Sequence, residues 1–459
     1  MDAIRCQGCL ERDKRIVQLE RRVAELEARV TRLMNQLEEA VRAGKRQAAP
    51  FSKRPPKRAP KKPGRKAGED YGIKAHRQAP ESIDEVLEAP LPDACPDCGG
   101  PVEETDIQQQ YQTEIVRRAL HRQFNVHIGT CQDCHKRVQG RHELQTSDAL
   151  GAAAAQLGPD AQAAVVELNK NAGLSQGKVV SCLKNLFGIS LSRGGSAHTV
   201  LRVGHRCEPV YATIRGTVRS AAWVVPDETG WRVGGLPAWL HGFVAADATA
   251  YVIDPTRSGS VAEALLGLDY AGIMIHDGWS TYNQFLNAEH QQCLRHFLNR
   301  CEEILATATR GSVRFPRAVQ HVLHRALNLR DRCLAGEVSA HGLKIARARL
   351  EFDFFAAILG SKIDPTNERL AQHLRNHCGE IFRFLDHPGL DATNWRAEQA
   401  MRFGVILRKI WGGNRTWAGA RAQAVLMSVW RTCWQRGRSA LNFVSQLLRH
   451  AAIPLPAPP

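Results

Sequence analysis

Three β-rich runs between residues 221 and 279 constrain the fold of this chain most strongly. The runs AAWVVPDETGWRV, AWLHGFVAADATAYVID and AGIMIHDGW are short, largely apolar and broken by Gly, Pro and Asp, as the strands of one sheet are. After Gly278 the chain is almost wholly helical as far as a Pro-rich tail. This order predicts an α/β domain over residues 206–450, a helical insert at about 298–385 and a disordered tail at 451–459.

Two aspartates close apolar runs of this predicted sheet. Asp227 ends the first run and Asp277 the third, so adjacent strands could present both carboxylates at one edge. Glu398 supplies a third acid, on a predicted helix with Asn394 near its start. Three convergent carboxylates can hold two Mg²⁺ or Mn²⁺ ions, the arrangement that cleaves phosphodiesters. Any one of these acids alone is more simply a cap or a surface charge, because the chain has 46 acidic residues.

Paired cysteines indicate metal rather than disulfides. The chain has 13 cysteines, an odd number, and its start, MDAIRCQGCLERDKR, is too charged for a signal peptide. Two CxxC pairs predict a closed, structural four-cysteine zinc site within residues 81–145, with unpaired structural thiols as the alternative. The predicted ligands are Cys95, Cys98, Cys131 and Cys134. Cys6 and Cys9 form a third pair, either half of a zinc site shared by two chains or free thiols.

The first 80 residues combine a heptad repeat with a basic linker. Apolar residues alternate at steps of three and four, which predicts a coiled-coil dimer over residues 1–42, with a lone amphipathic helix as the alternative. The repeat consists of Ile16, Leu19, Val23, Leu26, Val30, Leu33 and Leu37. Residues 43–80 are rich in Pro, Lys and Arg and predict an extended linker.

Charge and a helical pair suggest a nucleic-acid partner. The net charge is +16, and residues 42–68 hold eleven Lys or Arg and no acid, which favours a polyanion over a merely solubilising surface. Residues 160–169 and 174–187 predict two helices around a turn, the outline of a helix-turn-helix within a DNA-binding region at 146–205. Predicted DNA contacts in these front segments are Lys61, Lys62, Arg65, Lys66, Lys178 and Lys184.

The order of these parts closely resembles the transposases of insertion sequence family sixty-six. The resemblance rests on the coiled coil, the linker ending in Lys-Lys-Pro-Gly-Arg-Lys, the CxxC pairs, the helix-turn-helix, and the motifs Asp-Glu-Thr, Asp-Gly-Trp and Asn-Trp-Arg-Ala-Glu. It implies a fold similar to ribonuclease H and retroviral integrase, in which Asp227, Asp277 and Glu398 bind the catalytic metal. Glu228 is expected to point to the other face of its strand and to be non-catalytic.

Smaller features accompany the resemblance. Cys293 and His296 match a Cys-x-x-His signature found after the second aspartate in several transposase families, although two such residues on a helix often simply pack. The family tends to keep basic residues beyond the glutamate, which implies phosphate contacts there or a solvated helix face. The residues concerned are Arg402, Arg408, Lys409, Asn414 and Arg415. Many members have Arg directly after the glutamate, where this chain has Gln399.

The expected protein is therefore a multidomain α/β transposase. It would bind the terminal inverted repeats of its element and catalyse metal-dependent strand cleavage and strand transfer as a homo-oligomer, at least a dimer. With no apolar run long enough for a membrane span, it is expected in the cytoplasm, associated with the bacterial nucleoid. The resemblance leaves open whether accessory proteins of the element take part. The alternatives are a dimeric zinc-containing DNA-binding regulator with an inactive carboxy-terminal domain, and a metal-dependent nuclease or resolvase outside transposition.

Overall fold

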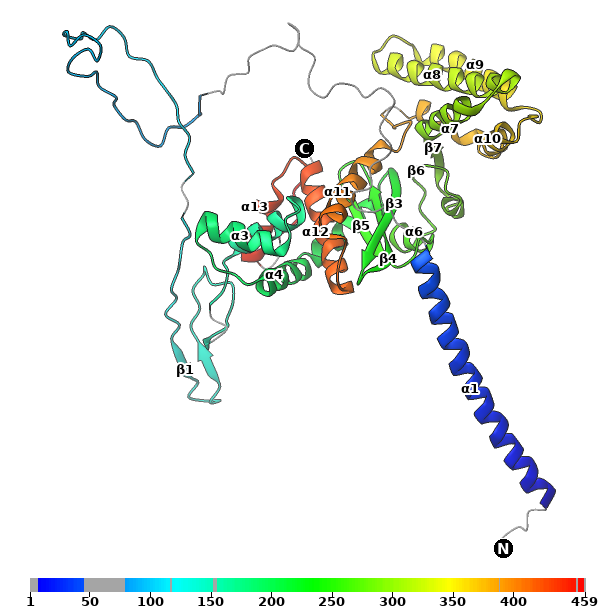
Figure 1. Cartoon of the computed structure of the whole chain (residues 1–459), viewed down its shortest axis with the longest axis horizontal. Coiled ribbons are helices and arrows are strands. Elements are labelled where there is room, and N and C mark those ends of the chain that lie inside the picture. The colour runs from blue at the N-terminus through cyan, green and yellow to red at the C-terminus, as the bar shows by residue number, and fades with distance from the viewer. Residues whose placement is uncertain are drawn as a thin grey trace.

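The computed structural model describes residues 7–44, 79–115, 118–151, 155–387, 389–450 and 453–457. The first helix, α1 (Gln7–Gly44), is long and extends away from the rest of the molecule (Figure 1). Its heptad positions from Ile16 to Leu33 are each about half exposed. The helix expected from the heptad repeat is thus present, with its apolar seam uncovered in the single chain.

A five-stranded mixed sheet forms the centre of the molecule, in the order β5-β4-β3-β6-β7. The central strand β3 pairs antiparallel with β4 and parallel with β6. At the two edges of the sheet, β5 is antiparallel to β4 and β7 is parallel to β6. The strands are β3 (Trp223–Val233), β4 (Leu236–Val244), β5 (Thr249–Asp254), β6 (Ile273–His276) and β7 (Glu289–Gln292). The three predicted β-rich runs supply the first four of these.

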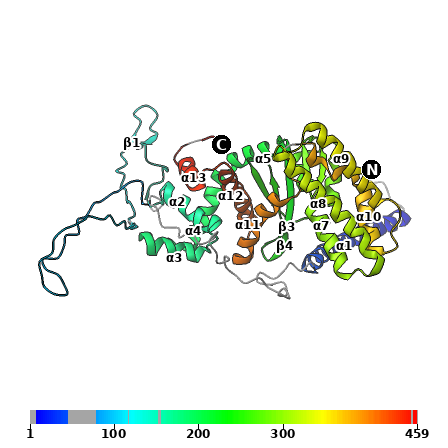
Figure 2. The same cartoon turned by 90° about the horizontal axis from the view of Figure 1, so that it is seen from above.

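Helices cover both faces of the sheet. Side chains that alternate along β3 enter different cores: Val225 packs with the cluster that includes α11 and the insert, and Val224 with the cluster of the amino-terminal helices, α12 and α13. Figure 2 shows the sheet between helices α2 (Pro159–Val166), α3 (Gln176–Phe187) and α4 (Arg193–Arg206) at one end and the insert helices at the other. The carboxy-terminal helices are α11 (Trp395–Trp411), α12 (Trp417–Gln435) and α13 (Ala440–Arg449).

Two details differ from the sequence-based expectation. Residues 289–292 form β7 instead of belonging to a helical stretch, and their sequence, EHQQ, has no apolar alternation that would predict a strand. Pairing with β6 along the edge of the sheet defines this strand. Asp227 lies within β3 and not at its end, because the hairpin with β4 continues the strand to Val233.

A helical insert separates β7 from α11. Its long helices are amphipathic or apolar and share the first core cluster with the sheet. The elements are α7 (Leu294–Thr307), η5 (Arg310–Val313), α8 (Arg314–Leu334), α9 (Ala340–Ile358), α10 (Pro365–Asn376), η6 (Cys378–Glu380) and η7 (Arg383–Leu385). No helix in the described part of the chain is both long enough and apolar enough to cross a membrane.

The predicted helical pair is present and packs on the body of the molecule. A π-helical turn, η3 (Glu167–Asn171), extends the first helix, and Ser175 caps the second by accepting from the N–H of Lys178. Gly204 lets the third helix approach α12, since a Cβ there would lie 2.8 Å from Cβ of Ala422. The helices are α2 (Pro159–Val166), α3 (Gln176–Phe187), α4 (Arg193–Arg206) and α5 (Glu208–Arg219). The region predicted at 146–205 therefore shares a core with the carboxy-terminal helices.

Lys170 on the π-helical turn is buried, with 4% of its surface exposed. Its Nζ donates to Oε1 of Gln423 at 2.5 Å and lies 4.7 Å from the ring centroid of Trp411. Burial lowers the pKa of Lys170 to about 7. Since the hydrogen bond and the ring join η3 to α11 and α12, this lysine links the helical pair to the carboxy-terminal helices.

The pKa of Lys170 predicts how stability varies with pH. Because its pKa is lowered in the folded state, the unfolded chain binds more protons between about pH 7 and pH 10, so this residue makes stability rise with pH in that window. The gain is at most about 1.4 kcal/mol per pH unit. Urea unfolding should therefore show a steeper rise from neutral to alkaline pH in the parent than in Lys170→Met. Equal slopes would contradict a neutral buried lysine.

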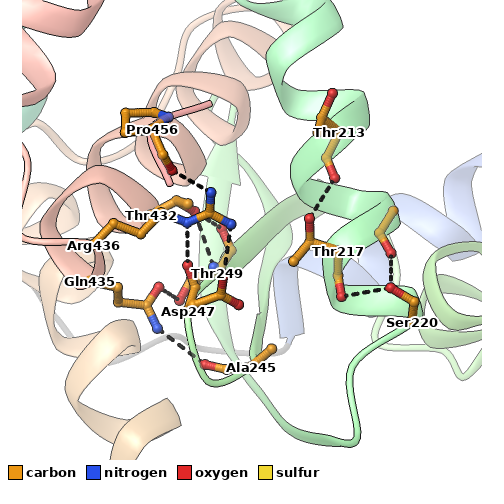
Figure 3. Close-up of polar contacts among 11 residues, drawn as sticks. Thr213, Thr217, Ser220, Ala245, Asp247, Thr249, Thr432, Gln435, Arg436 and Pro456 are labelled. Carbon is orange, nitrogen blue, oxygen red and sulfur yellow. Dashed lines mark hydrogen bonds and ion pairs between the residues drawn. The ribbon is translucent and has the colours of Figure 1, made fainter. Parts of the chain in front are cut away.

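The end of α12 fastens the sheet to the carboxy-terminal tail (Figure 3). Arg436 donates to the backbone oxygen and the carboxylate of Asp247, each at 2.9 Å, and to the carbonyl of Pro456 at 2.6 Å. Ile453 and Leu455 pack against the second core cluster. Residues 453–457 of the tail, which is expected to be disordered over 451–459, therefore contact this buried arginine and the second core cluster.

The remaining described elements are small. Helix α6 (Ser260–Leu266) and the 3-10 turn η4 (Ser280–Gln284) flank β6 in sequence. A two-stranded hairpin, β1 (Ile128–Thr130) with β2 (Arg137–Gln139), surrounds the second CxxC pair.

Candidate active site

Asp227 and Asp277 lie side by side at the sheet. The parallel register pairs Trp223 with Ile273 and Val224 with Met274, an offset of fifty residues that brings Asp227 level with Asp277. Asp277 directly follows β6, whereas Asp227 lies within β3 opposite Gly242 of β4. Both aspartates are partly buried. The two predicted acids are therefore brought together by neighbouring parallel strands.

A tight turn after β6 orients Asp277. Its Oδ1 accepts from the N–H of Trp279 at 3.0 Å, and the N–H of Gly278 donates to Nδ1 of His276 at 3.2 Å. Burial is the main cause that lowers the pKa of His276 to about 3, so the ring is neutral. With Nδ1 accepting, Nε2 carries the hydrogen and donates to Nδ1 of His290 at 3.0 Å. The turn is thus anchored to β7.

Glu398 is presented by the first turn of α11. Gly242, the partner of Asp227, leaves the room for this helix, because a Cβ there would lie 2.6 Å from Sδ of Met401. The hydroxyl of Tyr251 donates to the carbonyl of Ala400 at 2.8 Å. Met401 lies one turn beyond Glu398, so these contacts hold the glutamate above the same part of β3.

Asn394 and Cys293 tie the start of α11 to the sheet. Asn394 is 2% exposed, and its side chain accepts from the Cys293 thiol at 3.2 Å instead of capping the helix. The N–H of Cys293 donates to the carbonyl of His276 at 2.8 Å. Cys293 therefore positions the start of α11 against β6.

The three acids interact through their charges. Burial, together with the charges of Glu228, Asp277 and Glu398, raises the pKa of Asp227 to about 7. A cation among these carboxylates would relieve both the burial and the repulsion, and oxygen ligands are those that Mg²⁺ and Mn²⁺ prefer. The donor set fits such an ion, although within the described ranges no three His, Cys, Asp or Glu side chains lie close enough to hold one.

The predicted basic residues are distributed over two surfaces. Lys178 and Lys184 are exposed on α3. Arg402, Lys409 and Arg415 are exposed on or just after α11, and Arg408 is half-buried with its guanidinium donating to the carbonyl of Gly230. Asn414 extends the β3 hairpin, accepting from Nε1 of Trp231 at 2.8 Å. Lys61, Lys62, Arg65 and Lys66 lie outside the described residues, as does Cys6 of the first cysteine pair.

Each of the two CxxC pairs at 95–98 and 131–134 forms the same turn. The fifth residue, Gly99 or His135, has a positive φ and donates its N–H to the carbonyl of the first cysteine, at 2.8 and 3.0 Å. Backbone N–H groups of Cys98 and Asp97 lower the pKa of the Cys95 thiol, and those of Cys134 and Asp133 that of Cys131. Such thiolate-stabilising turns fit a metal ligand, although the two pairs do not meet in the described structure.

We expect the full chain to bind zinc through these four thiols. Native mass spectrometry should find one more zinc per chain in the parent than in Cys95→Ser or Cys131→Ser, because a closed four-thiolate site loses most of its affinity with one ligand. Cys182→Ser, which changes a cysteine outside any CxxC pair, should keep the metal. Equal zinc content in all four proteins would contradict the assignment.

Some residues around the acids carry no signal in the sequence. Arg257 stands alone in a polar loop, Tyr282 lies in a short 3-10 turn, and Gln292 belongs to the unpredicted β7. These residues come from segments that lie 25 or more residues from Asp227 in the sequence. Contacts between those segments bring them near the carboxylates. A local pattern could not have identified them.

Comparison with known families adds an independent finding. The family model described as Transposase IS66 family matches residues 155–422, a range that contains Asp227, Asp277 and Glu398 and begins after the CxxC pairs. A comparison with curated proteins gives no match. Because the matched range is more than half of the 459 residues, the chain belongs to the IS66 family of transposases.

Proposed function

We propose that this chain binds the terminal inverted repeats of an insertion sequence and catalyses metal-dependent DNA cleavage and strand transfer, with Asp227, Asp277 and Glu398 as the catalytic acids. One observation supports the proposal: the β3–β6 register aligns the two aspartates, and the charge of Glu398 acts on Asp227.

The fold that we propose for this domain is ribonuclease H-like. Its support is the mixed sheet, whose central strand carries the first aspartate and whose parallel neighbour delivers the second. Helix α11 crosses the face of β3 on which Asp227 lies, because Gly242 opposite Asp227 leaves room for Met401. A domain of this kind exposes its acids at one edge, where a DNA strand can reach them.

Divalent metal is part of the proposal. Two Mg²⁺ or Mn²⁺ ions would be held by Asp227, Asp277 and Glu398 and would supply an activated hydroxyl and charge stabilisation at the leaving oxygen. The protein's own part is to fix the carboxylates: the Asp277 turn, the Gly242 contact and the Asn394 anchor do so.

DNA is the proposed partner. Exposed lysines on α3 and exposed basic residues around α11 offer phosphate contacts from two elements of the domain. The basic linker and the zinc module would add contacts in front of residue 155. Such a distribution suits a protein that binds both element ends and target.

The second proposed partner is another copy of the chain, through α1. Its half-exposed apolar seam would be buried in a two-stranded coiled coil. Sedimentation velocity should give a dimer for the parent and a monomer for Leu26→Asp, because pairing of the helices would bury the charge of the new aspartate in the apolar seam. Ala28→Asp, off the seam on the same helix, is the control and should stay dimeric. A monomeric parent would contradict the pairing.

The function is tested on the DNA that flanks the gene. A supercoiled plasmid carrying the element's ends should be nicked and joined to a target in the presence of Mg²⁺ or Mn²⁺, and chelation should stop both reactions. A dimeric regulator would bind the ends without cutting them. A nuclease or resolvase outside transposition would cut without joining the ends to a target.

A further inference from the structure

Arg257 makes an ion pair with Glu228, the residue that follows Asp227 in β3. Its Nε and Nη2 donate to Oε1 of Glu228 at 2.8 and 2.5 Å. The other oxygen of Glu228 accepts from the hydroxyl of Tyr282 at 3.2 Å. The Glu228 side chain is only 4% exposed. Both of its oxygens are therefore engaged, and its role is to hold an arginine.

Two tryptophans hold the same guanidinium. Its Cζ lies 4.7 Å from the ring centroid of Trp279 and 5.2 Å from that of Trp239. Trp279 is also the residue whose N–H orients Asp277. The guanidinium is thus coupled to both aspartates, through Glu228 next to Asp227 and through Trp279 next to Asp277.

The loop that carries Arg257 is fastened at both ends. The carbonyl of Thr256 lies 3.1 Å from Nε2 of His241 on β4. Gln284 donates to the carbonyl of Gly259 at 3.2 Å, and a Cβ on Gly259 would lie 2.3 Å from Cγ2 of Thr281. These contacts attach the loop to the sheet and to the turn after Asp277. The arginine is therefore preorganised and loses little freedom on binding.

A rigid guanidinium with a free edge suits a phosphate. The Arg257 side chain is 43% exposed. Within the described residues no hydrogen bond engages its Nη1. Arginine binds phosphate oxygens through its fork of N–H groups, and stacking on aromatic rings leaves that fork available. The four acids nearby would otherwise repel a DNA strand.

We infer that Arg257 binds a phosphate oxygen of the DNA strand at the carboxylate site, and that Glu228, Trp239 and Trp279 position its guanidinium. The inference rests on the proposed function. It gives the second acid of the Asp-Glu-Thr motif a role that differs from metal binding.

Salt dependence of DNA binding tests the contact directly. With a duplex carrying the element's end, Arg257→Gln should lower the slope of log K against log salt by about 1, because one phosphate contact is lost. Arg257→Lys keeps the charge and should keep the slope. The matched control is Arg219→Gln. Arg219 precedes β3 and pairs at 3.0 Å with Asp269, which precedes β6, and both side chains are exposed. Breaking this pair should leave the salt slope unchanged.

Cleavage tests the geometry. Arg257→Gln should slow nicking by on the order of 10²-fold, as removal of a preorganised donor does. Arg257→Lys should slow nicking by about tenfold, because an ammonium group cannot reproduce the planar fork of N–H groups. Glu228→Gln should leave the salt slope of DNA binding unchanged and should slow nicking by about tenfold, because Arg257 remains but is held less firmly.

Two results would overturn the inference. One is an unchanged salt slope in Arg257→Gln, which would make the ion pair merely structural. The other is nicking by Arg257→Gln within about threefold of the parent, well short of the loss expected for a donor. The proposed function fails differently: the parent itself would then show no metal-dependent nicking, while the salt slope would still report on the phosphate contact.

Discussion

Asp227→Asn should abolish DNA nicking and strand transfer while leaving binding to the element's ends intact. We expect a loss of about 10³-fold or more, because a lost metal ligand removes several kcal/mol of charge stabilisation and about 1.4 kcal/mol corresponds to tenfold. Asp277→Asn and Glu398→Gln should behave alike. The rate of plasmid nicking under single-turnover conditions measures the effect.

The same substitution should stabilise the metal-free protein. Burial and the neighbouring acids raise the pKa of Asp227 to about 7, so the folded chain binds more protons than the unfolded chain between about pH 4 and pH 7. The proton on Asp227 therefore stabilises the folded chain, and this stabilisation is lost as the pH rises through that window. Asn carries no charge, and at about pH 8 it should raise the free energy of unfolding by about 1–4 kcal/mol.

Lost activity with gained stability is the pattern expected of a functional acid. Millimolar Mg²⁺ should raise the melting temperature of the parent and not that of Asp227→Asn. Asp269→Asn, which changes an exposed ion-paired acid, is the control and should keep its nicking rate. If Asp227→Asn nicks as fast as the parent, the catalytic assignment is wrong.

Gly278→Ala should damage both stability and cleavage. Gly278 has a φ of +88°, and a Cβ there would lie 2.6 Å from Oε1 of Gln292 and 3.1 Å from Nε2 of His373. Gln292 is fully buried and bound to Glu380 at 2.7 Å, so it has little room to move. Backbone strain alone costs about 1–3 kcal/mol. The displaced turn would also move Asp277, which we expect to slow nicking by at least about tenfold.

A second glycine separates strain from contact. Gly437 also has a positive φ, +62°, but a Cβ there would meet no atom within 4 Å. Gly437→Ala should therefore show the strain alone, with nicking unchanged. The free energies of unfolding of the two variants, measured in urea, should differ by the cost of the buried contact at Gly278. If Gly278→Ala is no less stable than Gly437→Ala and nicks at the parent rate, the tight turn does not hold Asp277.

Much of the fold is predictable because its signals are local. Apolar runs of strand length indicate β3 to β6, since each strand buries alternate residues on both faces. The helical pair at α2 and α3 follows from its periodicity and the turn at Gly173, whose φ is +75°. By contrast, β7 has a polar sequence and exists because β6 offers a free parallel edge.

The candidate site is predictable only in part. Asp227, Asp277 and Glu398 could be singled out by their contexts and by family resemblance, and the geometry supports their convergence. Arg257 could not, because its partners Glu228, Trp239 and Trp279 come from two strands and a turn. A contact between distant segments leaves no periodic trace in any of them.

The candidate acids show how sequence and tertiary structure divide this information. The sequence by itself determined which residues could serve: three carboxylates after or within apolar segments, cysteines in CxxC pairs, and a heptad seam. Only the tertiary structure decided which of them meet. Strand register aligned Asp227 with Asp277, a glycine on β4 let α11 approach β3 beyond Glu398, and an arginine paired with Glu228. Register and packing depend on the whole core, so no local stretch encodes them.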